Sequence, residues 1–188
     1  MTVKGKIRII GGRYRGRKIS VVHEEIRPTS DRVRETLFNW LNPKLVNKSC
    51  LDLFAGTGIL GIEALSRGAR KVVFVDHQQD IVSEIKNQVN TLQLKNASVI
   101  FSDSLSYLKN PNNLDPFDII FLDPPFGVYS LEKLLEHIEK TKSLNPQGMV
   151  YYESSQPLEN RMISNSWDNY RESNAGNVYY GLLTKKNT

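Results

Sequence analysis

The sequence is poor in the residues that build disulfides and metal centres. Its single cysteine, Cys50, excludes an intramolecular disulfide, and the apolar run around it is typical of a buried, inert thiol. The three histidines stand apart from one another and show no zinc-ligand spacing. We therefore expect neither a metal site nor a thiol-dependent enzyme.

Long apolar segments are also missing. No run approaches the roughly 20 apolar residues of a membrane-spanning helix, and the first residues lack the apolar core of a signal peptide. The expected location is therefore the cytoplasm, with no membrane partner. A length of 188 residues, with 39% hydrophobic and 24% charged residues, is ordinary for one globular domain with at most a small appendage.

Acidic residues are absent from the first 18 residues, which contain seven Lys and Arg. Residues 1–48 contain 12 basic and 4 acidic side chains, whereas residues 49–188 contain 13 and 16. A basic segment of this kind indicates a polyanionic partner, because each Lys or Arg placed near a phosphate releases counterions. The alternative is a solvated, flexible basic tail.

The pattern of the first 48 residues predicts a β-hairpin followed by a helix. Strand-like runs at residues 7–10 and 13–19 lie on either side of Gly11-Gly12, and glycine accepts the positive φ of tight hairpin turns. Capping candidates at residues 29–31 precede apolar positions with helical spacing at residues 33–41, and the helix should end near Pro43.

From residue 49 onward, strand and helix patterns alternate, which predicts an open, mostly parallel α/β sheet. An antiparallel pair at the end of the chain should close it. Ligands of such sheets bind beyond the carboxyl ends of the strands. We expect strands at residues 50–54, 71–75, 98–101, 117–122 and 149–152, helices at 59–65, 81–92, 104–108 and 131–138, and the closing pair at 170–172 and 178–183.

A glycine-rich motif follows the first of these strands. Residues 56–61 read GTGILG, which fits G-x-G-x-x-G, and Asp76 ends the next strand about 20 residues later, where its carboxylate can bind ribose hydroxyls. NAD and S-adenosylmethionine both contain adenosine, so this pattern fits either cofactor, or a glycine turn without a ligand. Asp52 favours S-adenosylmethionine, because a carboxylate suits its amino group and opposes a pyrophosphate.

A second motif, Asp123-Pro124-Pro125-Phe126, ends a nearly all-apolar strand. Proline fixes φ and removes an N–H, so this turn is rigid and directs its carbonyl groups outward. Asp123 and the Pro124 carbonyl can accept the two N–H bonds of an exocyclic amine, while Phe126 stacks on the base. Such acceptors stabilise the positive charge that a nitrogen develops during methyl transfer.

These motifs resemble those of class I S-adenosylmethionine-dependent methyltransferases that modify exocyclic amines. More narrowly, the segments IRIIGGRYRGRK at residues 7–18 and RPTSDRVRETLF at residues 27–38 resemble the RsmD family, bacterial 16S rRNA guanine-N2 methyltransferases. The resemblance covers almost the whole chain and implies a Rossmann-like fold. We expect a mostly parallel seven-stranded sheet with an antiparallel C-terminal strand, in a methyltransferase domain at residues 28–188 after a basic hairpin extension at residues 1–27.

The resemblance also implies site residues. The catalytic loop would consist of Asp123, Pro124, Pro125 and Phe126. The pocket for S-adenosyl-L-methionine would contain Thr29, Arg34, Asp52, Phe54, Gly56, Gly58, Asp76, Asp103 and Ser104. The RNA-binding residues would be Arg8, Arg13, Arg15, Arg17 and Lys18, and the partner 16S rRNA within a small ribosomal subunit or an assembly intermediate.

Three other functions stay open at this point. The same catalytic loop fits an adenine-N6 methyltransferase, although 188 residues leave little room for a DNA sequence-reading domain. A nicotinamide-dependent oxidoreductase fits the glycine motif, but the Pro-Pro-Phe turn supplies no proton donor. A non-enzymatic RNA-binding module with a vestigial pocket is the third.

Overall fold

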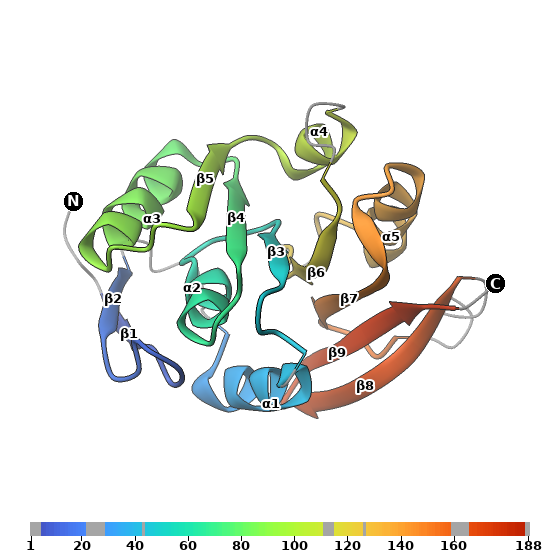
Figure 1. Ribbon diagram of the computed structural model, residues 1–188. Helices are drawn as coiled ribbons and strands as arrows, with labels where there is room; N and C mark the ends of the chain where they lie inside the picture. Colours follow the sequence, from blue (N-terminus) through green and yellow to red (C-terminus); the bar gives the residue numbers. More distant parts are fainter. Residues whose placement is uncertain are drawn as a thin grey trace. The chain divides into compact units, whose positions relative to one another are not determined.

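The computed structural model describes residues 5–21, 29–42, 44–110, 115–125, 127–158 and 166–186. The chain divides into two compact units, Met1–Ser104 and Leu105–Thr188, which are taken in turn. The elements of both can be followed by their labels in Figure 1.

The first unit begins with the hairpin of β1 (Gly5–Arg8) and β2 (Lys18–Val21), which pair antiparallel. Three parallel strands follow, with β4 between β3 and β5. Their core is apolar, and Leu51, Phe74 and Val75 have no exposed surface. The remaining elements of this unit are α1 (Asp31–Leu41), β3 (Ser49–Asp52), α2 (Ile59–Ser66), β4 (Lys71–Asp76), α3 (Gln79–Thr91) and β5 (Ala97–Phe101).

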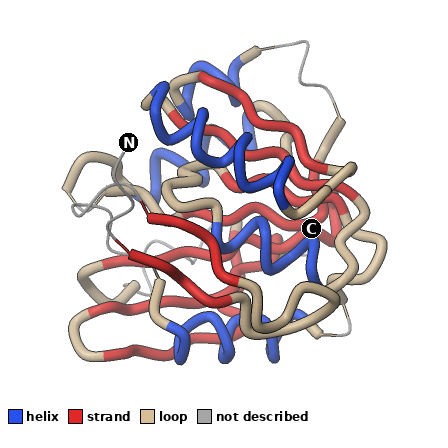
Figure 2. The backbone as a smooth tube through the Cα atoms, turned by 90° about the vertical axis from the view of Figure 1, so that its left-hand side faces the viewer, coloured by secondary structure: helices blue, strands red, loops and turns tan. Residues whose placement is uncertain are grey.

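The expected hairpin is present, but the predicted length and position of its turn are wrong. Residues 9–17 form a long connection instead of a two-residue turn at Gly11-Gly12 (Figure 2). The reason is that this connection binds the end of α2. The Arg13 N–H donates to the Ser66 carbonyl at 2.7 Å, and a Cβ atom on Gly12 would lie 1.9 Å from that oxygen. The glycines therefore permit a close approach to α2.

The second unit contains a parallel pair and an antiparallel pair of strands. β6 pairs parallel with β7, and β9 pairs antiparallel with both β7 and β8. β7 is longer than predicted, because its ladder to β6 extends back to Leu144 past an irregularity. The elements are β6 (Phe117–Leu122), α5 (Leu131–Lys140), β7 (Leu144–Ser154), β8 (Trp167–Ala175) and β9 (Val178–Lys185), after α4 (Ser104–Lys109) at the boundary.

The strand order of the sheet is β5-β4-β3-β6-β7-β9-β8. The predicted fold class is thereby confirmed, with seven strands, of which β9 near the C-terminus is antiparallel, and a separate two-stranded hairpin. The periodicities located the helices well, since α1 to α3 and α5 each overlap a predicted range.

Candidate active site

The glycine-rich loop between β3 and α2 has a backbone that only glycine adopts without strain. Gly56 and Gly58 have φ of +50° and +74°. The Gly58 N–H donates to the Ala55 carbonyl at 2.7 Å, which closes the turn directly before α2. A Cβ atom on Gly58 would also lie 3.3 Å from Ile85 of α3.

Gly61 lets α2 approach the sheet. A Cβ atom at this position would lie 2.2 Å from the Phe74 ring of β4, a distance no side chain tolerates. The third glycine of the motif therefore permits close packing of the helix on the strand.

Asp76, at the end of β4, holds the glycine loop in place. Its Oδ2 accepts a hydrogen bond from the Gly56 N–H at 3.0 Å, and its Oδ1 accepts one from the Gln78 N–H at 2.9 Å. Both bonds are charge-assisted and fix the carboxylate. The arrangement holds a carboxylate at the position where the sequence motif places the ribose-binding acid.

Asp52 is a carboxylate buried beneath the same loop. It is 2% exposed, and its Oδ2 accepts a hydrogen bond from the Gly61 N–H at 3.0 Å. Burial raises the pKa of Asp52 to about 7, and the negative charge of Asp76 adds to this rise, while the Gly61 N–H opposes it. A cation placed beside Asp52 would stabilise its ionised form, so the site suits a positively charged ligand group.

The residues after β5 lie beside the ends of β3 and β4. The Ser104 Oγ donates to the Leu53 carbonyl at 2.8 Å, and the Ser102 N–H donates to the Asp76 carbonyl at 3.0 Å. Ser104 is buried, Asp103 is exposed and Phe54 is half-buried. The structure thus brings together Asp52, Phe54, Gly56, Gly58, Asp76 and Ser104 from the predicted cofactor set, all within the first unit.

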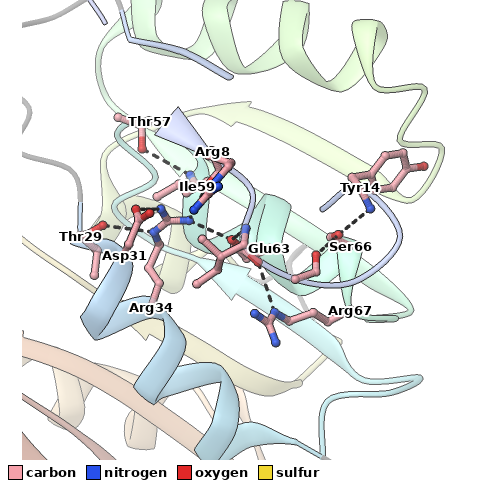
Figure 3. A network of polar contacts seen from close by, with 12 residues as sticks. Arg8, Tyr14, Thr29, Asp31, Arg34, Thr57, Ile59, Glu63, Ser66 and Arg67 are labelled. Atoms are coloured by element: carbon pink, nitrogen blue, oxygen red, sulfur yellow. Dashed lines mark hydrogen bonds and ion pairs between the residues drawn. The ribbon is translucent and has the colours of Figure 1, made fainter. Parts of the chain in front are cut away.

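Arg34 of α1 lies in a buried network of polar contacts (Figure 3). Its side chain has no exposed surface, and its Nη1 donates to Glu63 of α2 at 2.8 Å and to the Arg8 carbonyl at 3.1 Å. Its Nη2 donates to Asp31, and its Nε to the Thr29 carbonyl at 3.2 Å. Arg34 therefore joins the hairpin, α1 and α2. The predicted cofactor contacts of Thr29 and Arg34 stay predictions.

Glu63 is the partner that the sequence analysis missed. Its Oε1 also accepts a hydrogen bond from the Ile10 N–H at 2.6 Å, and its Oε2 accepts one from Arg67 at 3.2 Å. The available signal was an acidic residue within the mostly apolar α2, ILGIEALS. Buried carboxylates require such partners, because an unpaired buried charge is costly.

The predicted catalytic loop follows β6 in the second unit. Asp123 is half-buried, Pro124 is buried and Pro125 is exposed. The Pro125 carbonyl accepts a hydrogen bond from the Val128 N–H at 3.2 Å, and Gly127 has φ of +80°. This bond closes a turn through the Pro125 carbonyl. Phe126, predicted to stack on the base, lies outside the described residues.

A buried pair on β7, missed by the sequence analysis, lies in the same unit. The Tyr151 hydroxyl donates to Glu153 Oε1 at 2.8 Å, and the Tyr151 ring meets the Phe121 ring edge-on at 6.3 Å. Burial raises the pKa of Tyr151, and the negative charges of Glu153 and Asp123 raise it further. Tyr151 therefore stays protonated and remains a hydrogen-bond donor.

The predicted RNA-binding side chains are exposed. Two of them lie at Tyr14, whose ring has the guanidinium groups of Arg13 and Arg17 each 5.6 Å from its centroid. Planar guanidinium and phenol groups of this kind can contact phosphates and stack on bases. The exposed basic residues of this group, which we call the hairpin cluster, are Arg8, Arg13, Arg15, Arg17 and Lys18.

The described residues lack two kinds of feature. Among them, no helix is both long and apolar enough to cross a membrane. Within the same residues, no group of three His, Cys, Asp or Glu side chains has a metal-binding arrangement.

Comparison with known proteins identifies relatives along nearly the whole chain. A family model described as "Conserved hypothetical protein 95" matches residues 7–184. The chain is 42% identical to the ribosomal RNA small subunit methyltransferase D of Haemophilus influenzae, over 95% of this chain and 94% of that protein. It is 40% identical to the protein of the same name from Escherichia coli, over 97% of this chain and 91% of the relative.

A solved structure agrees with these matches. The structure of a putative methyltransferase from Escherichia coli superposes with a TM-score of 0.86 at 40% identity, covering 98% of this chain and all of that one. The resemblance of the N-terminal motifs to the RsmD family is therefore confirmed, and the chain belongs to this family, which includes the small-subunit ribosomal RNA methyltransferases D.

Proposed function

We propose that the protein transfers a methyl group from S-adenosyl-L-methionine to the exocyclic N2 amine of one guanine in 16S rRNA. Its relatives are named as methyltransferases of the small-subunit ribosomal RNA. The observation that carries the choice of an exocyclic amine is the Asp123-Pro124-Pro125 segment, which follows a buried strand and whose Pro125 carbonyl accepts the Val128 N–H. We assign the acceptor role to Asp123 and the Pro124 carbonyl, which precede this bond in the loop.

The first unit fits S-adenosylmethionine. Asp52 is a buried carboxylate that a cationic amino group would stabilise, and Asp76 is fixed at the end of β4 for ribose hydroxyls. The positive φ of Gly56 and Gly58 lets the backbone pass close to a ligand. The cofactor supplies an activated methyl group on a positively charged sulfur.

The residues of the catalytic loop act on the amine. Its lone pair forms the new N–C bond as the C–S bond breaks, and that electron pair goes to sulfur, giving S-adenosylhomocysteine. The nitrogen gains positive charge and then loses one proton. Asp123 and the Pro124 carbonyl accept the N–H bonds that strengthen as this charge develops, and Asp123 is the nearest base for the proton within this loop.

The hairpin cluster supplies affinity for RNA by phosphate contacts without reading sequence. We infer that the target guanine lies in a loop, because an unpaired base is extruded at lower cost. The substrate is the 16S rRNA within a small ribosomal subunit or an assembly intermediate, which places the enzyme in the cytoplasm.

Asp123→Ala tests the catalytic assignment. The variant should lose turnover by about 100-fold or more, the usual effect of removing one transition-state hydrogen-bond partner, while its affinity for S-adenosylmethionine stays close to that of the native protein. Single-turnover methylation and calorimetric cofactor binding measure the two effects. Asp118→Ala is the control on the same strand, where Asp118 accepts a hydrogen bond from Asn145 at 3.0 Å. Near-native turnover of Asp123→Ala would refute the acceptor role.

A further inference from the structure

Glu153 lies next to the catalytic loop in the register of the second unit. β6 and β7 are parallel, with Phe121 opposite Tyr151 and Leu122 opposite Tyr152. Continuing this register by one residue places Asp123 beside Glu153. Because side chains alternate along a strand, Tyr151 and Glu153 lie on one face of β7 and Tyr152 on the other.

Glu153 is a buried carboxylate, and a hydrogen bond fixes its orientation. Glu153 is 7% exposed, and the hydroxyl that binds it belongs to Tyr151, which has no exposed surface. A carboxylate at such a position is unfavourable unless it has partners. The two oxygens of a carboxylate present about four lone-pair sites, so Glu153 can accept a base N–H in addition to the Tyr151 hydroxyl.

Guanine offers a donor that matches this geometry. Its Watson–Crick edge presents the N1–H directly beside the N2 amine, whereas adenine presents an unprotonated N1 beside its N6 amine. A carboxylate next to the amine-binding loop accepts the N1–H of guanine, and it repels the N1 lone pair of adenine. Sites that bind a ring donor reject analogues without it, because a buried acceptor is then left unpaired.

We propose that Glu153, oriented by the Tyr151 hydroxyl, is the residue that selects guanine by accepting its N1–H beside the Asp123 loop. This inference rests on the proposed guanine-N2 activity and adds to it a residue that determines specificity. Glu153 would contact the substrate base, and Tyr151 would act as a positioning residue through Glu153.

The test uses 2,6-diaminopurine, which keeps the N2 amine but has a lone pair at N1. The guanine that the native enzyme methylates is mapped first. A 16S rRNA with one 2,6-diaminopurine at that position is then prepared by splinted ligation and assembled into subunits. The native enzyme should prefer guanine in kcat/KM by at least about 100-fold. In Glu153→Gln the preference should fall below about tenfold, because the amide can donate to the N1 lone pair.

Two further variants make the result specific. Tyr151→Phe keeps the ring and removes the hydroxyl. The preference of this variant for guanine should also fall, but by a smaller factor than in Glu153→Gln. Glu172→Gln is the matched control, since Glu172 accepts a hydrogen bond from the Tyr152 hydroxyl at 3.4 Å on the other face of the sheet. This control should keep the native preference.

The outcomes separate the two proposals. If the native enzyme methylates guanine N2 but the preference is unchanged in Glu153→Gln and Tyr151→Phe, the role of Glu153 is refuted and the proposed function stands. If the native enzyme forms no N2-methylguanine, the proposed function fails and the inference fails with it. Should Glu153→Gln fold poorly in thermal unfolding, the Tyr151→Phe preference alone decides.

Discussion

The single residue Asp52 favours the binding of a cationic ligand and lowers the stability of the ligand-free protein. Its pKa is raised from 3.8 to about 7 by burial, so the folded protein binds this proton more tightly than the unfolded chain does. The Asp52 contribution to stability is therefore largest in acid and is lost as the pH rises from about 4 to about 7. A bound cation would reverse this loss.

Asp52→Asn is the corresponding prediction. Asparagine has the same shape, stays neutral and can still accept the Gly61 N–H, so the free energy of unfolding should increase by on the order of 2 kcal/mol at pH 8 and by less at pH 5.5. Affinity for S-adenosylmethionine at pH 8 should fall about tenfold or more, because a charge-assisted hydrogen bond is lost. Urea unfolding at both pH values and calorimetry measure these effects. An equal stability gain at both pH values would contradict the burial argument.

Residue roles differed in how well the sequence predicted them. Asp76, Gly58 and Gly61 belong to a motif whose spacing itself reflects the geometry. Glu153 and Glu63 belong to no motif, and their partners, Tyr151 and Arg34, become visible only when strands and helices are placed side by side. A buried pairing across elements leaves no local pattern.

At the scale of elements, the connection between β1 and β2 is attached to α2. The Ser66 Oγ accepts a hydrogen bond from the Tyr14 N–H at 2.9 Å and donates one to the Gly11 carbonyl. Gln88 of α3 also donates to the Ser20 carbonyl of β2 at 2.9 Å. The basic segment is therefore a fixed part of the first unit over residues 5–21, which excludes a solvated tail there. The pattern around the glycine pair predicted the hairpin correctly. It misplaced the turn, because the contact with α2 joins residues that are far apart in the sequence.

Two glycines of this connection provide a matched pair of variants. Gly12 and Gly16 both have positive φ, but a Cβ atom on Gly12 would clash with the Ser66 carbonyl, whereas one on Gly16 meets nothing within 4 Å. Gly16→Ala should cost about 1 kcal/mol of unfolding free energy from backbone strain, and Gly12→Ala at least about 2 kcal/mol more. Urea unfolding measures both. Equal losses in the two variants would mean that the contact with α2 contributes nothing.

The charged network of α1 and α2 yields another prediction at this scale. Glu63→Ala removes the buried one of the two carboxylates that pair with Arg34 and leaves the exposed Asp31, and removal of one partner from a buried pair costs about 3–5 kcal/mol. Because Glu63 also binds the Ile10 N–H, hydrogen exchange at Ile10 should rise in the same variant. Protection at Ile10 that stays native would show that Glu63 does not hold the connection.

For the whole molecule, the strand and helix periodicities predicted the seven-stranded fold, and the N-terminal motifs predicted the family. The fold prediction succeeds because apolar patterns reflect burial on the sheet, and the N-terminal segment is recognisable by its basic charge and its motifs. The expected division into a hairpin extension and a methyltransferase domain stays a prediction.

The hairpin cluster leads to a prediction about the complete enzyme on its RNA. Replacing Arg13, Arg15 and Arg17 by Ala should weaken RNA binding and reduce the slope of log affinity against log salt by about two to three units, since each phosphate contact contributes nearly one unit. Fluorescence titration at several salt concentrations measures the slope, and cofactor affinity should not change. A salt dependence equal to that of the native protein would show that the hairpin cluster does not contact the RNA.

Identification of the methylated nucleoside is the measurement that decides the proposed function. The native protein is incubated with labelled S-adenosylmethionine and small ribosomal subunits that lack the modification, and the RNA is then digested and analysed by mass spectrometry. The proposed function predicts N2-methylguanine at a single position of the 16S rRNA. N6-methyladenine, or no methylated nucleoside in any RNA offered, would contradict it.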